Sequence, residues 1–111
     1  MPKRIFVVSD RIGGANPELG AALMKNFIYS IARAKPLPKA VNLMNDGVRL
    51  ACEGSASLDD LALLAEQGVA VRACGTCLDY LGLTEQLAVG EIGSMPDAAA
   101  ALLADDTLTI A

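Results

Sequence analysis

The sequence predicts a single α/β domain over residues 1–111, a three-layer α/β/α sandwich around a mostly parallel sheet of about five strands. Short apolar stretches alternate with amphipathic ones along the whole chain, which is the pattern of strands joined by crossover helices. A chain of 111 residues has room for one core only. No internal repeat, low-complexity segment or interdomain linker interrupts it.

The first strand is predicted at residues 4–9, where four consecutive apolar residues indicate a strand covered on both faces. A loop at residues 9–14 follows. A helix then begins with Asn16 as its cap, because Pro17 suits the first helical position. Apolar residues every four positions predict its buried stripe: Leu19, Leu23, Phe27 and Ile31.

The remaining strands are predicted at residues 39–45, 69–73, 88–92 and 107–110. Further helices are predicted from Ser57 to just before Gly68, over residues 77–81, and from Ser94 through residue 103. Residues 48–54 form a short helix or a turn. In a parallel sheet the functional crevice lies beyond the carboxyl ends of the strands. Three loops are expected to meet there, at residues 9–14, 45–55 and 74–79.

Composition narrows the possible partners and location. With 53% hydrophobic and 20% charged residues, the surplus apolar surface predicts a homo-oligomer. The net charge of −4, without clustered Lys or Arg, lacks the electrostatic footprint of a nucleic-acid binder. The apolar run after Lys3 and Arg4 is too short for a signal peptide or a membrane span. We therefore expect no membrane partner and a cytoplasmic protein with reduced thiols.

Histidine is absent from the sequence. This excludes Ser-His-Asp and Cys-His catalysis, and imidazole ligation of a metal, within one chain. Any chemistry must use Cys, carboxylate, hydroxyl, Lys, Arg or backbone groups.

The strongest candidate site is Cys74-Gly75-Thr76-Cys77, which follows a predicted strand and opens a helix. Helix N-terminal N–H groups stabilise a thiolate, which predicts a thiol pKa lowered to about 3.5–7.5. Gly75 allows close backbone approach, and the Thr76 hydroxyl can cap the helix or donate to a sulfur. The alternative is a pair of small buried hydrophobes. Two thiolates fall short of the four ligands of structural zinc, so we expect no metal or cofactor, with a zinc shared between subunits left open.

The other candidate residues lie in the two remaining loops. Ser9 and Asp10 are expected to line the pocket, in a strand–helix turn that lacks the phosphate-binding glycine patterns of nucleotide sites. The alternative for Asp10 is that it simply pairs with Arg11 or with solvent. Asn45-Asp46-Gly47 is primarily a turn signal, although Asn45 is expected at a strand tip beside Cys74. Glu53 faces the crevice as a proton-transfer group or is simply solvated. Cys52 is predicted to be a buried structural cysteine.

Several segments together carry a family resemblance. The most specific are residues 74–79 (C-G-T-C-L-D) and 88–92 (A-V-G-E-I). Weaker matches are residues 8–13, 18–20, 23–25, 44–48 and 53–55. Over nearly its whole length the chain resembles the DsrE/DsrF-like sulfur-relay family. It is most similar to the C-terminal DsrE-like domain of YedF-type proteins, which are described as sulfurtransferase-like and linked to selenium metabolism.

The resemblance implies an α/β/α fold, assembly into dimers, trimers or hexamers, and an acceptor cysteine after the third strand, which is Cys74 here. Cys74 would accept sulfane sulfur, or a selenium equivalent, from a donor protein as a persulfide and pass it to a partner thiol. Cys77 would be able to release this load by attacking Cys74. Longer YedF proteins carry an N-terminal TusA-like domain, whereas this sequence begins at the first strand. A separate TusA-like partner would then supply that domain, or this chain does something else.

Two other functional classes remain open. A thiol–disulfide redox protein would use Cys74 and Cys77 as its dithiol. A non-enzymatic oligomeric binding subunit would instead contain packed, unreactive cysteines.

Overall fold

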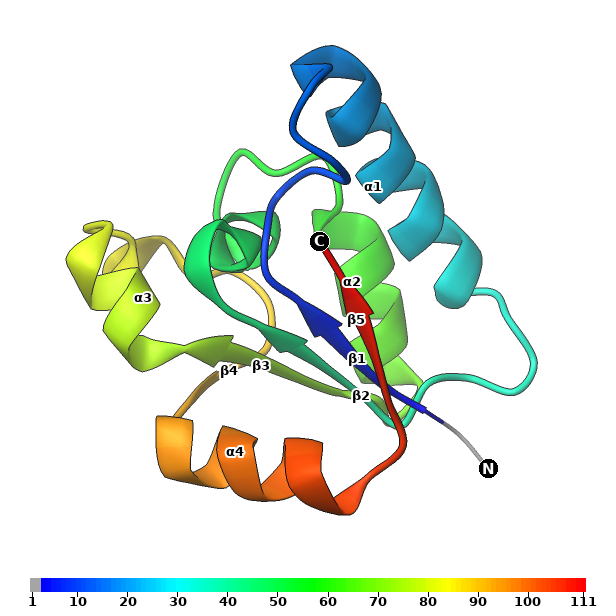
Figure 1. Cartoon of the computed structure of the whole chain (residues 1–111), viewed down its shortest axis with the longest axis vertical. Helices are drawn as coiled ribbons and strands as arrows, with labels where there is room; N and C mark the ends of the chain where they lie inside the picture. The colour runs from blue at the N-terminus through cyan, green and yellow to red at the C-terminus, as the bar shows by residue number, and fades with distance from the viewer. Residues whose placement is uncertain (1–2) are drawn as a thin grey trace.

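The computed structural model describes residues 3–111 and shows the predicted α/β fold (Figure 1). Over these residues five strands form one parallel sheet in the order β4-β3-β2-β1-β5. The strands are β1 (Arg4–Val7), β2 (Ala40–Leu43), β3 (Ala70–Cys74), β4 (Glu91–Gly93) and β5 (Thr107–Ile110). The helices are α1 (Pro17–Ile31), α2 (Leu58–Glu66), α3 (Gly75–Tyr80) and α4 (Met95–Ala104), with 3-10 helices at Asn45–Ala51 and Thr84–Gln86. None of these helices has the length and apolar character needed to span a bilayer.

The main core lies between the sheet and two helices, α1 and α2, which cover one face (Figure 1). Successive strand residues point to opposite faces, and the strand registers align the buried ones across the sheet. The strand residues of this core are Ile5, Val7, Val41, Leu43, Val71 and Ala73. The two helices add Met24, Ile28, Leu61 and Leu64.

The opposite face is covered by α4 and only in part (Figure 1). Helix α4 is rich in alanine and contains no fully buried residue. Burial alternates along β1, where Arg4 and Phe6 are half-buried and Ile5 and Val7 are buried. The prediction that this strand is covered equally on both faces is therefore wrong, because short alanine side chains do not fill the space above it.

The residues of helix α1 that are buried lie one position after those of the predicted stripe. Its buried residues are Gly20, Met24 and Ile28. Leu19 and Leu23 are 56% and 42% exposed, so the predicted stripe is wrong for these two. Gly20 explains the difference, because a Cβ there would lie only 2.7 Å from the carbonyl oxygen of Ile12. The exposed leucines are apolar side chains that the predicted contact between subunits could use.

Among the other predicted start and stop signals of the helices, those at Ser94 and Gly68 are confirmed. The Ser94 hydroxyl caps α4 by accepting a hydrogen bond from the N–H of Asp97 at 3.3 Å. Gly68 follows α2 with a φ of +91°, which favours glycine. Asn16 and Ser57 occupy the cap positions of α1 and α2, although neither side chain makes a capping hydrogen bond. The uncertain segment after β2 is a 3-10 helix.

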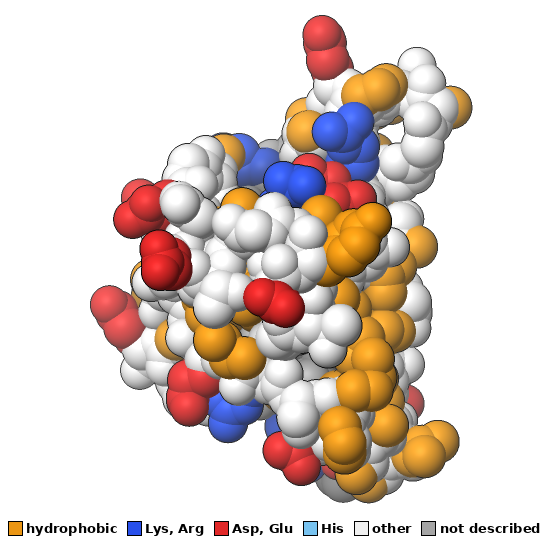
Figure 2. Space-filling view, turned by 90° about the vertical axis from the view of Figure 1, so that its left-hand side faces the viewer, with side chains coloured by type: hydrophobic (Ala, Val, Ile, Leu, Met, Phe, Trp, Pro, Cys, Tyr) orange, Lys and Arg blue, Asp and Glu red, His pale blue; other side chains and the backbone are white. Residues whose placement is uncertain are grey.

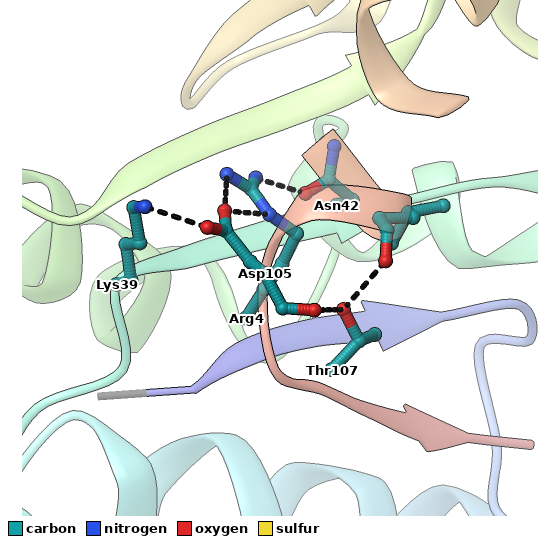
Figure 3. Close-up of polar contacts among 6 residues, drawn as sticks. Arg4, Lys39, Asn42, Asp105 and Thr107 are labelled. Carbon is teal, nitrogen blue, oxygen red and sulfur yellow. Dashed lines mark hydrogen bonds and ion pairs between the residues drawn. The ribbon is translucent and has the colours of Figure 1, made fainter. Parts of the chain in front are cut away.

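Arg4 connects the end of α4 to the sheet (Figure 3). Its Nε and Nη2 donate to Oδ2 of Asp105 at 3.1 and 2.8 Å, and its Nη1 donates to Oδ1 of Asn42 at 2.7 Å. Lys39 Nζ donates to the other Asp105 oxygen at 2.8 Å. The hydrogen bond from Lys39, followed by that from Arg4, holds the pKa of the Asp105 carboxyl below its ordinary value. Asp105 directly follows α4, so this network fixes the end of the helix over β1 and β2.

Gly47 is a close contact between the segment after β2 and the end of β1. A Cβ at this position would lie 2.5 Å from the carbonyl oxygen of Val7. We expect Gly47→Ala to lower the free energy of unfolding by about 1–3 kcal/mol, because backbone has to move. Urea unfolding measures this change. Gly14→Ala is the matched control, because nothing lies within 4 Å of a Cβ there, and it should change stability by less than about 1 kcal/mol. Equal losses in both variants would contradict this account.

Candidate functional site

The segment after β2 lies beside α3 at the carboxyl ends of the strands (Figure 1), the side of the molecule that faces the viewer in Figure 2, whereas the loop after β1 runs toward the start of α1. The loop after β1 and the 3-10 helix after β2 together line a polar pocket, which includes Asp10 and Arg49. The N–H of Asn45 donates to Sγ of Cys77 at 3.1 Å. This bond joins the second loop to Cys77, whereas the sequence placed Asn45 beside Cys74.

Cys74 is the last residue of β3 and lies opposite Gly93 of β4. Its side chain is directed to the α4 face, where it lines a small hollow with Gly93, Ser94 and Ala98. The residue is only 6% exposed. The hollow has a volume of about 10 Å³, which is close to the minimum that holds one water molecule. Cys74 is therefore enclosed, with space beside it for one small atom.

Cys77 lies in the first turn of α3 and is half-buried. Burial raises the pKa of its thiol, and a side-chain hydrogen bond with Cys74 raises it further, whereas the N–H of Asn45 lowers it. The net shift is upward, so the predicted lowering of the thiol pKa is wrong for Cys77. Helix α3 has only six residues, and desolvation outweighs the favourable N–H groups. The Cys77 thiol consequently stays protonated at neutral pH.

The two residues between the cysteines differ in how they match their predicted roles. A Cβ at Gly75 would lie 2.9 Å from Cγ2 of Ile92, so the predicted close approach is present. Thr76 is exposed and its hydroxyl makes no hydrogen bond within residues 3–111. The structure therefore shows neither the predicted cap nor a bond to a sulfur.

Ser9, Asp10 and Glu53 lie apart from the cysteine pair. Ser9 and Asp10 line an open polar pocket of about 630 Å³, where Asp10 also pairs with Arg11 at 3.5 Å. Glu53 is exposed and lines a neighbouring pocket of about 350 Å³, which shares Asp10 and Arg49 with the first. Neither cysteine of the pair lines either pocket. The predicted pocket residues Ser9, Asp10 and Glu53 therefore do not form one site with the cysteine pair.

Cys52 is 3% exposed and its Sγ donates to the carbonyl oxygen of Val48 at 3.2 Å. Burial raises the pKa of this thiol. Its environment matches that of the predicted structural cysteine. Among residues 3–111, no group of three or more Cys, Asp or Glu side chains is arranged to hold a metal ion.

Asn42 and Arg72 line the hollow beside Cys74 and were not among the predicted site residues. They are register partners on β2 and β3. Arg72 precedes Cys74 by two positions, and strand residues two apart share a face. Asn42 is a polar residue inside an apolar strand. These two features were visible in the sequence and could have identified both residues.

The sheet order, its all-parallel pairing and the helices around it define an α/β protein with a YchN-like fold. The crystal structure of the YchN protein from E. coli aligns with 99% of this chain and 100% of its own, with a TM-score of 0.71 and 24% sequence identity. Protein MTH1491 of unknown function from Methanobacterium thermoautotrophicum aligns with a TM-score of 0.62 and 16% identity, covering 98% of this chain and 99% of that one.

BT1422, a conserved protein of unknown function from Bacteroides thetaiotaomicron, has a TM-score of 0.61 and 12% identity, over 97% of this chain and 95% of that one. No protein-family model matches the chain, and no curated protein sequence matches it. Likeness at these identities shows the fold, which agrees with the DsrE/DsrF-like α/β fold implied by the sequence resemblance.

Because burial raises the pKa of Cys77, we expect its alkylation by iodoacetamide to be slow at neutral pH. The rate should rise with pH to a midpoint above the ordinary thiol value of about 8.5, because only the thiolate reacts. Mass spectrometry of the modified peptide measures this rate. The unfolded chain is the control and should show the ordinary midpoint. Cys74→Ala should lower the midpoint only in part, because burial is the larger cause. A midpoint in the folded protein at or below that of the unfolded chain would contradict the assignment.

Proposed function

We propose that the chain is a sulfur-relay protein in which Cys74 carries sulfane sulfur, as a persulfide, from a donor protein to an acceptor thiol. The observation that carries this proposal is the hollow beside Cys74, which has room for about one water-sized atom. A persulfide adds one atom to the cysteine, and that atom is only slightly larger than a water molecule. Gly93 and Ala98 line the hollow with little side-chain bulk. The YchN-like fold supports the proposal through the resemblance to sulfur-relay proteins.

The transfer needs no oxidant or reductant. The Cys74 thiolate attacks the terminal sulfur of a donor persulfide, R–S–SH, and the bond between the donor's two sulfurs breaks. The donor leaves as the thiolate R–S⁻, and Cys74 holds the load as Cys74–S–SH. An acceptor thiolate then attacks the terminal sulfur and releases the Cys74 thiolate. The same steps carry selenium when the donor supplies it.

Cys77 has a different role from the one first expected. Its raised pKa keeps it as a thiol at neutral pH, and a thiol is a poor nucleophile. Attack of Cys77 on the Cys74 persulfide, which would release the load and leave a disulfide, is therefore slow. Cys74 is a neighbour that helps to keep Cys77 protonated, so the Cys77 S–H is placed to stabilise negative charge on sulfur at Cys74. The load thus persists until an external thiolate reaches it.

A thiol–disulfide redox function is the second candidate. The influence of Cys74 on the pKa of the Cys77 thiol shows that the two side chains are neighbours, as a disulfide between them would require. One observation weighs against it: the second cysteine of the pair has a raised pKa rather than a lowered one.

Intact-protein mass spectrometry tests the relay. Wild type, Cys74→Ser and Cys77→Ser are each incubated with a cysteine desulfurase that carries a persulfide. We expect wild type and Cys77→Ser to gain the mass of one sulfur atom and Cys74→Ser to gain none, because only Cys74 has the adjoining hollow. Cys77→Ser is the matched control, since it makes the same change three residues away. Loading of Cys74→Ser contradicts the assignment. Loss of two hydrogens without added sulfur favours the redox function, and no change at all favours a non-enzymatic role.

A further inference from the structure

We propose that the cleft between α4 and the sheet binds a sulfur-bearing amino acid of cysteine size and presents its sulfur to Cys74. The inference rests on the relay function and names a second class of donor, a small-molecule persulfide. It concerns a part of the molecule that the relay from protein donors does not require.

The cleft is a continuation of the hollow beside Cys74. It has a volume of about 280 Å³, enough for about nine water molecules, which suits a molecule of amino-acid size. Five residues line both spaces, so that the wider cleft narrows into the hollow: Asn42, Arg72, Gly93, Ser94 and Ala98. A ligand held in the cleft can therefore extend one atom toward Cys74.

Asn42 indicates that the cleft is built for a polar ligand. The residue is only 5% exposed, and its Oδ1 accepts a hydrogen bond from Arg4 at 2.7 Å. Its Nδ2 points away from Arg4 in Figure 3 and donates no hydrogen bond within residues 3–111. No fully buried side-chain nitrogen or oxygen within residues 3–111 lacks a hydrogen-bond partner, so this Nδ2 is accessible from the cleft and can donate to a ligand there. An acceptor atom of a ligand in the cleft would complete the hydrogen bonding of Asn42.

Charged groups of opposite sign line the two walls of the cleft. On the sheet, Arg72 uses Nη1 to bind the exposed Glu91 at 3.0 Å, which leaves other guanidinium nitrogens for a ligand. On α4, Asp97 is exposed and forms no ion pair within the described residues. Arg72 and Asn42 Nδ2 suit a carboxylate, and Asp97 suits an ammonium group. An α-amino acid carries both groups next to each other.

Transfer of sulfur from the bound ligand to Cys74 needs no oxidant or reductant. The bound amino acid enters as its persulfide, and the Cys74 thiolate attacks the terminal sulfur. The sulfur–sulfur bond of the ligand breaks and its electron pair leaves with the inner sulfur. Cys74–S–SH remains on the protein, and the amino acid departs as its thiolate.

Binding is measured on Cys74→Ser, which cannot take up sulfur. L-Cysteine is titrated under reducing conditions while the side-chain amide signals of Asn42 are followed by NMR. We expect these signals to shift and to saturate. Arg72→Gln should weaken the binding at least about tenfold, because a charge-assisted contact is lost. Arg49→Gln is the matched control, an exposed arginine that also pairs with a carboxylate, and should bind as before. Unmoved Asn42 signals, or equal losses in both variants, would overturn the proposal.

A second comparison tests the predicted orientation. L-Cysteine should bind more tightly than 3-mercaptopropionate, which lacks the ammonium group, and Asp97→Asn should remove that preference. A preference that survives in Asp97→Asn would overturn the assignment of the ammonium to Asp97.

Loading of proteins with an intact Cys74 separates this inference from the relay itself. Arg72→Gln should lose loading from L-cysteine persulfide and keep loading from a persulfide-carrying desulfurase. If both donors load Arg72→Gln as well as they load wild type, the cleft is not the donor site, although the relay stands. If neither donor loads wild type while L-cysteine still binds, the relay fails and with it the donor role of the cleft.

Discussion

Arg4 donates three hydrogen bonds at the point where β1 and β2 pass beneath the end of α4, two to Asp105 and one to Asn42. Helix α4 contributes no fully buried side chain, so its position depends on this contact more than on apolar packing. The side chains of Arg4 and Asp105 are only 11% and 19% exposed, which shields the pair from the screening that weakens surface ion pairs. A helix fixed at its end but loosely packed along its length leaves a cleft, and this cleft leads to Cys74.

The alternation of side chains along β3 decides which groups meet in that cleft. Val71 and Ala73 complete the core beneath α1 and α2, so Arg72 and Cys74 must face α4. Because β3 ends at Cys74 and α3 begins at once, Cys77 returns to the same place from the first turn of the helix. Its burial keeps that thiol protonated. One cysteine is thus placed beside a space for a single atom, and the other lies next to it as a protonated thiol.

The sequence predicted the five strands, their order along the chain and the cysteine pair at a strand tip, because these follow from local patterns. The prediction of the buried face of α1 was wrong, because the sequence of this helix contains two apolar patterns. Helix α1 has two apolar stripes. The stripe that contains Gly20 is buried instead of the leucine-rich one, because Gly20 lets the helix pack closely against the preceding loop. The predicted lowering of the Cys77 pKa was also wrong, because the sequence shows that a helix begins there but does not show that the thiol is desolvated. Asn42 and Arg72 were missed although their strand periodicity placed them on the face of Cys74.

The most direct test is a crystal structure of the protein after loading with sulfane sulfur. The account predicts one additional sulfur atom bonded to Sγ of Cys74, lying in the hollow between Gly93 and Ala98, with α4 unmoved. The Cys77 sulfur should remain unmodified and within hydrogen-bond distance of the N–H of Asn45. Additional sulfur on Cys77, or a disulfide between the two cysteines with the hollow empty, would contradict it.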